Sequence, residues 1–180
     1  MATIHGIVVQ NSVQAVNIDS LNRSVVGVVD IDNGFVFSLS GYSATSGQGE
    51  VWTSATPLTG SLTNLWMAYE PEVVITVSGT KQYKGINPDP RDFYNISGTV
   101  FSAFKPQIGD LITLTDEALA GTKGANGYVV ATNNDMHLNW AAAAVTGLSL
   151  KLQSTTYVSI ADGSIGTQRK TAYIFEVVAI

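Results

Sequence analysis

Apolar and polar residues alternate along much of this 180-residue chain with the two-residue period of β-strands. The period is clear in 35–40, where aromatic and leucine residues alternate with valine and serine, and in 148–153, where three leucines alternate with polar residues. About twelve short segments of this kind can be distinguished, with Gly-rich turns between them. The pattern predicts an all-β fold, a β-barrel or β-sandwich of many short strands with very little helix.

The last ten residues form the strongest strand pattern of the chain. Apolar side chains occupy both faces of this predicted strand, with Tyr173, Phe175 and Val177 on one face and Ile174, Val178 and Ile180 on the other. A strand that is apolar on both faces is typically buried on both. We therefore expect it to be covered on both sides, either by the chain's own core or by a partner.

The first 45 residues are predicted to form a separate N-terminal β-arm and hairpin. Ile4–Val9 is a candidate strand, and Ser24–Ile31 and Phe35–Leu39 are stronger ones. Between these two lies Asn33-Gly34, a pair that supplies the positive φ values of a tight hairpin turn. The Gly- and Ser-rich segment that follows marks a boundary, so the predicted units are residues 1–45 and a main β-domain at 46–180.

Helix is predicted only as single turns. Residues 91–95 follow two prolines and have room for one turn. Thr115 is a candidate N-cap for a second turn, with acidic residues at 116 and 117 that suit the helix dipole. The alanine run at 141–144 allows either a buried strand or a single helical turn.

The composition narrows the class of partner. Only 13% of the residues are charged, about half the usual ~25%, and the net charge is −5, which argues against direct nucleic-acid binding. No stretch approaches the ~18 consecutive apolar residues of a membrane-spanning helix, and the N-terminus lacks the pattern of a secretion signal. A surface of small uncharged residues is typical of one that another protein covers. An ordinary Ser/Thr-surfaced β-domain remains the alternative.

No pattern in the chain predicts a reaction centre. There is no cysteine, and neither His5 nor His137 has a further ligand residue at metal-site spacing. A hydrolase would need a nucleophile with its base, or two carboxylates across a cleft, and neither is indicated. We therefore expect no catalytic residue, no metal site and no cofactor, and a protein that is not an enzyme.

Several motifs in residues 64–180 resemble those of the auxiliary head proteins of tailed bacteriophages, which are also called decoration or cement proteins. The resemblance rests on NLWMAYEPE, on Phe104-Lys105-Pro106-Gln107-x-Gly109-Asp110, and on Gly163-Ser164-Ile165-Gly166-x-Gln168-Arg169. It implies a β-rich homotrimer that binds the major capsid protein on the outside of the assembled capsid. The implied location is the exterior of the virion, after assembly in the host cytoplasm, with no contact to nucleic acid or membrane.

The expected partner contacts lie in the N-terminal arm and at one tryptophan. Residues 1–20 contain few side chains large enough to anchor a core of their own, and an extended arm can add a strand to a neighbour's sheet through main-chain hydrogen bonds. Tryptophan is enriched at interface hot spots, although a loop tryptophan tucked onto the core is the alternative. The predicted contact residues are Ile4, Ile7, Val8, Val9, Val13 and Trp52.

Two other functions fit the same residues. A carbohydrate-binding or adhesin-type β-domain would use Trp52, Trp66 or Tyr83 as a platform for a sugar ring. A structural subunit of a phage tail is the second alternative, which the sequence does not separate from a capsid protein.

Overall fold

The computed structural model describes residues 5–8, 21–45, 49–72, 75–78, 81–84, 90–161 and 167–180. In this part of the chain the regular structure is β-strand, apart from short 3-10 turns such as η3 (Thr59–Ser61), η4 (Pro90–Asp92) and η5 (Asp116–Ala118). The predicted all-β fold is confirmed. No helix among the described residues is long and apolar enough to cross a membrane.

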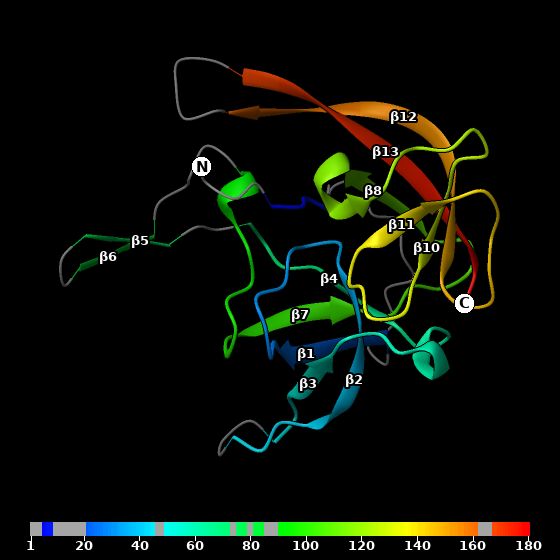
Figure 1. The fold of residues 1–180 in the computed structure, drawn as a ribbon. Helices are drawn as coiled ribbons and strands as arrows, with labels where there is room; N and C mark the ends of the chain where they lie inside the picture. Colours follow the sequence, from blue (N-terminus) through cyan, green and yellow to red (C-terminus); the bar gives the residue numbers. More distant parts are fainter. Residues whose placement is uncertain are drawn as a thin grey trace.

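Five strands close into a small barrel, which occupies the lower part of Figure 1. In spatial order they are β1 (Asn22–Val26), β3 (Trp52–Ala55), β2 (Val36–Tyr42), β4 (Trp66–Ala68) and β7 (Val100–Phe104). β1 and β3 run parallel, and the other neighbours in the barrel are antiparallel.

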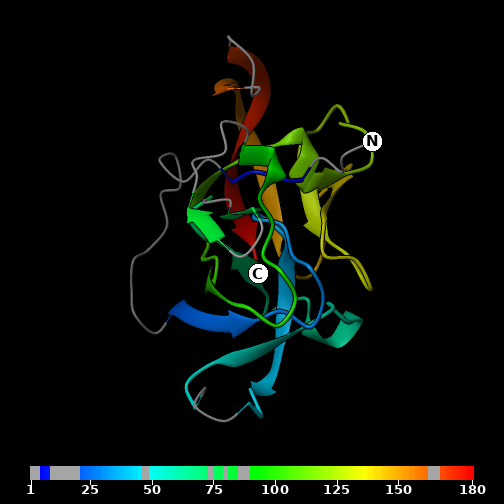
Figure 2. The same cartoon turned by 90° about the vertical axis from the view of Figure 1, so that its left-hand side faces the viewer.

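A six-stranded sheet lies beside the barrel, and its long central hairpin crosses the top of Figure 1. In spatial order its strands are β8 (Leu111–Thr115), β13 (Thr167–Ala179), β12 (Ser149–Ala161), β10 (Tyr128–Ala131), β11 (Leu138–Ala141) and β9 (Leu119–Ala120). A separate two-stranded sheet consists of β5 (Ile75–Ser78) and β6 (Lys81–Lys84). Figure 2 shows that the β12–β13 hairpin also extends beyond the rest of the molecule when it is viewed from the side.

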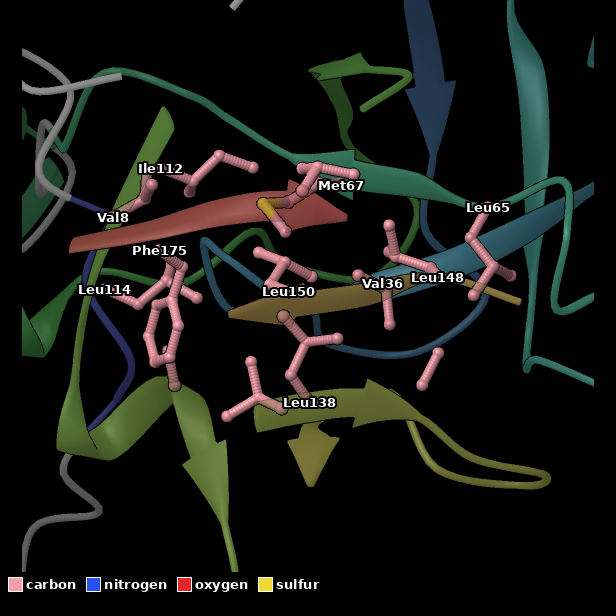
Figure 3. Packing of buried hydrophobic residues seen from close by; sticks show 14 of the residues in the cluster. Val8, Val36, Leu65, Met67, Ile112, Leu114, Leu138, Leu148, Leu150 and Phe175 are labelled. Atoms are coloured by element: carbon pink, nitrogen blue, oxygen red, sulfur yellow. The ribbon is translucent and has the colours of Figure 1, made fainter. Parts of the chain in front are cut away.

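The start of β2 and all of β4 are buried on both faces because they lie between two cores. On β2, Phe37 packs inside the barrel, whereas Val36 packs into a larger cluster shared with the sheet. On β4, Trp66 and Met67 divide in the same way. Figure 3 shows Val36 and Met67 in the larger cluster together with side chains from the sheet. Each such side chain contributes roughly 1.5–3 kcal/mol when it is fully buried, so the shared cluster holds barrel and sheet together.

The predicted N-terminal hairpin is not present. Asn33-Gly34 does form a turn, in which Gly34 has a φ of +85° and the Phe35 amide donates to the Asp32 carbonyl at 3.2 Å. The strands before and after this turn, however, are not paired with each other, since β3 lies between β1 and β2. The turn signal is local, whereas the pairing follows from closure of the barrel, in which β1 pairs with β3 and β7.

The predicted boundary after residue 45 falls inside a hairpin of the barrel. β2 continues to Tyr42 and pairs with β3, with Ser38 opposite Ala55 and Tyr42 opposite Trp52. Residues 21–45 therefore belong to the same barrel as strands from the second predicted unit.

The N-terminal segment 5–8 extends the sheet of its own chain. Val8 forms a β-bridge with Leu114 on β8, and the Thr115 amide donates to the Ile7 carbonyl at 3.2 Å. Thr115 does not cap η5 with its side chain, although the predicted helical turn is present. Its hydroxyl instead accepts a hydrogen bond from the Ile7 amide at 3.4 Å.

The last strand is buried on one face and partly open on the other. Tyr173, Phe175 and Val177 lie in the shared core, as expected. Ile174 and Val178 are half-buried, and Ile180 is 39% exposed. The described part of the chain thus covers one face of β13 completely and the second face only in part.

Candidate protein-contact surfaces

His5 and Gly6 attach the N-terminal segment to the turn at Asp32. The His5 imidazole Nδ1 lies 2.9 Å from one oxygen of the Asp32 carboxylate, and the Gly6 amide donates to the other oxygen at 2.9 Å. The His5 ring stacks on Tyr94 with the ring centroids 4.7 Å apart, and the His5 amide donates to the Arg91 carbonyl. Two separate parts of the chain, the turn at Asp32 and residues 91–94, therefore position His5 and Gly6.

Burial changes the interpretation of the predicted arm contacts. Ile7 and Val8 are only 4% and 1% exposed. Because both side chains are buried within their own chain, they present no surface to a partner in this structure, which contradicts their prediction as contacts. Ile4, Val9 and Val13 lie outside the described residues, so their predicted contacts stay predictions.

Asn33 connects the same turn to the loop after β4. Its side-chain amide donates to the Glu70 carbonyl at 2.8 Å, and its side-chain oxygen accepts from the Glu70 amide at 3.1 Å. Asn95 donates to the Ile31 carbonyl at 2.8 Å from the other side. Asn33 and Asn95 are both buried, so these bonds replace water as partners of the loop main chain. The network determines the shape of this end of the barrel.

Glu72 borders this network and has a perturbed acidity. Burial raises the pKa of its carboxyl group to about 7, and a hydrogen bond from the Asn33 amide opposes part of that rise. The donor and acceptor atoms of that bond are 3.5 Å apart, so it is weak. Glu72 is thus close to half-ionised at neutral pH.

Four exposed apolar side chains gather where two loops of the barrel meet. Gly98 donates its amide to the Gly27 carbonyl at 2.9 Å, and Val26 pairs with the first residue of β7, so the loops at 27–30 and 96–99 lie side by side. We call this region the barrel-end surface, and its apolar residues are Val28, Val29, Ile96 and Val100, each between 45% and 56% exposed. Contiguous exposed apolar residues on a soluble protein often mark an interaction site.

Trp52 begins β3 and forms an aromatic pair with Tyr42 on β2. The ring centroids are 4.4 Å apart, and the two residues are cross-strand neighbours. Trp52 is half-buried and packs against the barrel core, whereas Tyr42 is 63% exposed. Trp52 therefore contributes partly to the core, and Tyr42, which the sequence did not single out, presents the larger exposed area.

Of the other aromatic residues proposed for sugar binding, Trp66 is not available as a platform. Trp66 is 6% exposed inside the barrel, with the Arg23 guanidinium 5.4 Å from its ring centroid. The side chain of Tyr83 lies outside the described residues. An open pocket near Arg23 is lined by Asn22, Arg23, Ser24, Tyr69, Ser102 and Ala103.

The β12–β13 hairpin presents a second exposed surface. Tyr157 on β12 is 52% exposed, and the Arg169 guanidinium of β13 lies 3.9 Å from its ring centroid. Tyrosine and arginine are both enriched at protein interfaces. The sequence predicted the alternating leucines of β12 and the strand at the end of the chain, but it did not indicate how far the hairpin projects.

Asp135 and His137 form an aspartate–histidine pair within the loop between β10 and β11. Asp135 accepts from the His137 ring Nδ1 at 2.8 Å and from the Asn139 side chain at 2.8 Å. Burial raises the pKa of Asp135, but the hydrogen bonds from Asn139 and His137 outweigh it and lower the pKa below its ordinary value. No group of three or more metal-ligating side chains occurs among the residues that the structure describes.

The exposed apolar residues of the barrel-end surface were not predicted from the sequence, because strand propensity does not report exposure. Val28 and Val29 were included in a predicted strand, because β-branched residues favour strands whether or not they are covered. Their exposure depends on where β1 ends, at Val26, and on the neighbouring loop. No local signal in the sequence reports that packing.

Comparison of the chain with protein-family models, with curated proteins and with solved structures found no match.

Proposed function

We propose that this protein is a structural virion protein that binds the outer surface of a tailed-bacteriophage capsid and stabilises it. The carrying observation is the barrel-end surface, where four apolar side chains are exposed on a chain with few charges. Burying roughly 800 Å² on each partner is typical of a specific protein–protein contact, and the apolar centre of such a contact contributes most of its energy.

The proposed partner is the major capsid protein, and the proposed site is the capsid exterior. The resemblance of residues 64–180 to decoration proteins supports this partner, together with the homotrimer that it implies. Many copies bound to one capsid also gain from avidity, so each contact can be modest. A binding role requires no bond to be made or broken, which agrees with the chain's lack of a predicted reaction centre.

The test is co-sedimentation of the purified protein with capsids that lack it. The wild-type protein is expected to sediment with the capsids, and the double variant Val28→Lys/Val29→Lys to lose at least about tenfold in bound protein, because lysine is strongly hydrated at this surface. Val145→Lys is the matched control, since Val145 is also 45% exposed but lies in the loop after β11. A wild-type protein that leaves the capsids bare contradicts the proposal.

Imaging of virions distinguishes a capsid protein from a tail subunit. Density on the capsid exterior that disappears when the gene is deleted is the expected result. Loss of density from the tail instead would favour the alternative of a tail structural subunit.

A carbohydrate-binding role has one supporting observation, the exposed Tyr42 ring beside Trp52. Aromatic faces are suitable platforms for the apolar face of a sugar. A glycan array, with tryptophan fluorescence as the second measurement, tests this role. A sugar that binds the wild-type protein but not Tyr42→Ala would support it, and the absence of any response would exclude it for the glycans tested.

A further inference from the structure

The outer edge of β12 lacks a partner strand over its second half, among the residues that the structure describes. β12 pairs with β13 along its length, but β10 pairs with it only at Ser149–Lys151. Among the described residues, the last main-chain hydrogen bond on that side joins the Leu152 amide to the Gly127 carbonyl at 2.7 Å, and the Lys123 ammonium lies 3.5 Å from the Thr155 hydroxyl. On the other side of the hairpin, β8 pairs with β13 no further than Ala172.

The part of the hairpin beyond these pairings extends past the sheet, although the Ile160 side chain near its end is only 5% exposed. Both views show the far ends of β12 and β13 extending past β8. A two-stranded ribbon in water is marginally stable by itself, because it has few neighbours to pack against. Its free edge also presents main-chain N–H and C=O groups that can pair with another strand.

The two edges of this ribbon differ in their chemistry. The sequence from Thr156 to Ile160 contains β-branched residues, tyrosine and serine, with no charge and no proline. Such an edge is a good template for strand pairing. The β13 edge contains Arg169 and Lys170, and charged residues, lysine above all, are a usual means by which proteins block edge pairing. In the described part of the hairpin, the β12 edge at 156–160 is thus the one without lysine or arginine in its own sequence, although the Arg169 guanidinium lies over the Tyr157 ring.

We propose that the outer edge of β12 at residues 156–160 joins two copies of this chain, with the two β12 strands antiparallel about a two-fold axis. An antiparallel pair of identical strands is self-complementary, and two-fold contacts are the commonest in homo-oligomers. This contact goes beyond the proposed capsid binding and does not depend on it. Because it joins only two copies through one strand edge, it is compatible with the separate contacts of a homotrimer.

Charge distribution favours a second copy at this place. Residues 1–120 contain 11 acidic and five basic residues, whereas residues 121–180 contain three acidic and four basic residues. Two copies that meet through the hairpin therefore meet through the less acidic part of the sequence, which reduces like-charge repulsion between them. The exposed Tyr157 side chains of the two copies would lie near each other across the new pair of strands.

Single cysteines provide the test, because the chain has no cysteine of its own. One cysteine is placed at each position from 155 to 159 in turn, and each purified variant is oxidised mildly in the absence of capsids. Only the position nearest the two-fold axis faces itself at disulfide distance. We expect covalent dimers on a non-reducing denaturing gel to peak at one position, at least about fivefold above the control Thr167→Cys on β13.

A second substitution shows whether the main-chain edge is responsible. Ser159→Lys places two like charges at the interface and is expected to reduce cross-linking at the peak position at least about fivefold. Ala142→Lys, in the exposed loop after β11, is the matched control and is expected to change nothing. Circular dichroism confirms that each variant is folded.

Uniformly low cross-linking, or a peak at the β13 control, would overturn the contact between copies. Loss of capsid binding by the barrel-end variant would leave it standing, because the cross-linking is measured on the purified chain alone. The two proposals therefore fail separately.

Discussion

At the residue scale, Asn33 is a buried polar side chain whose hydrogen bonds reach a distant part of the chain. A side-chain amide in a turn usually bonds its own backbone locally. Here the amide instead bonds both main-chain groups of Glu70, 37 positions away. One buried side chain thereby joins the turn before β2 to the loop that follows β4.

Asn33→Ala is expected to lower the free energy of unfolding by roughly 2–4 kcal/mol, because it removes the side-chain partner of the partly buried N–H and C=O of Glu70. Denaturant unfolding measures the loss. Asn126→Ala is the control, since Asn126 makes one exposed hydrogen bond to the Ala142 carbonyl, and it should cost less than about 1 kcal/mol. Equal losses for the two variants would show that the Asn33 bonds contribute nothing special.

Glu72 makes stability depend on pH near neutrality. Its pKa rises from 4.5 to about 7 on folding. Between these values the unfolded chain is ionised while the folded chain retains the proton, so this contribution is complete below pH 4.5 and is lost as the pH rises through 7. Glu72→Gln removes the titration and should make the protein more stable than the wild type above pH 7 by about 1–2 kcal/mol, allowing for partial solvent screening.

Unfolding of both proteins at pH 5 and pH 8 measures the effect. The wild type should lose stability between the two values relative to Glu72→Gln, whereas the exposed control Glu50→Gln should follow the wild type. A pH dependence that survives in Glu72→Gln would assign it to another group.

At the scale of elements, the N-terminal segment packs against η5 at Gly6 with no room for a side chain. A Cβ at Gly6 would lie 2.9 Å from the Ala118 Cα and 3.1 Å from its backbone nitrogen. These are main-chain atoms, which cannot rotate away as a side-chain tip would. The absence of a side chain at position 6 therefore allows the segment to reach β8 and bury Ile7 and Val8.

Gly6→Ala is expected to displace the segment and to destabilise the protein by roughly 1–3 kcal/mol through the steric conflict. Gly60→Ala is the matched control, because no atom lies within 4 Å of a Cβ at that position. Hydrogen exchange of the Thr115 amide, which donates to the Ile7 carbonyl, should accelerate in Gly6→Ala alone. Unchanged exchange would show that the segment tolerates the added methyl group.

At the scale of the whole molecule, the barrel and the sheet share one hydrophobic cluster. Val36, Leu65 and Met67 come from the barrel strands or directly before them, and Leu150 and Phe175 come from the sheet. Loss of either part would expose this cluster to water. The two parts therefore depend on each other, and the division at residue 45 does not separate independent units.

We expect the barrel and the sheet to unfold in a single transition. Trp66 reports on the barrel and Trp140 on the sheet. Two variants that retain only one of these tryptophans, with the others replaced by phenylalanine, should show the same denaturation midpoint within about 0.2 M, as two-state unfolding requires. Midpoints that differ clearly would mean that the shared cluster does not couple the two parts.

The sequence by itself determined the class of fold and the place of many strands and turns. Alternation in 148–153 and the glycine turn at Asn33-Gly34 are local signals, since side-chain period and positive φ depend on near neighbours in the chain. The alternation in the last strand likewise grouped Tyr173, Phe175 and Val177 on one face, but it did not determine which of the two apolar faces lies in the core.

Tertiary structure alone decided which strands pair and which apolar residues stay outside. β3 inserts between β1 and β2 because the barrel closes, and the alternation within a strand contains no information about its neighbour. Ile7 and Val28 are both β-branched apolar residues of predicted strands. Ile7 is nevertheless buried in the segment beside β8, whereas Val28 is exposed on a loop. Burial is a sum over distant contacts, so the candidate contact surfaces became visible only when those contacts were known.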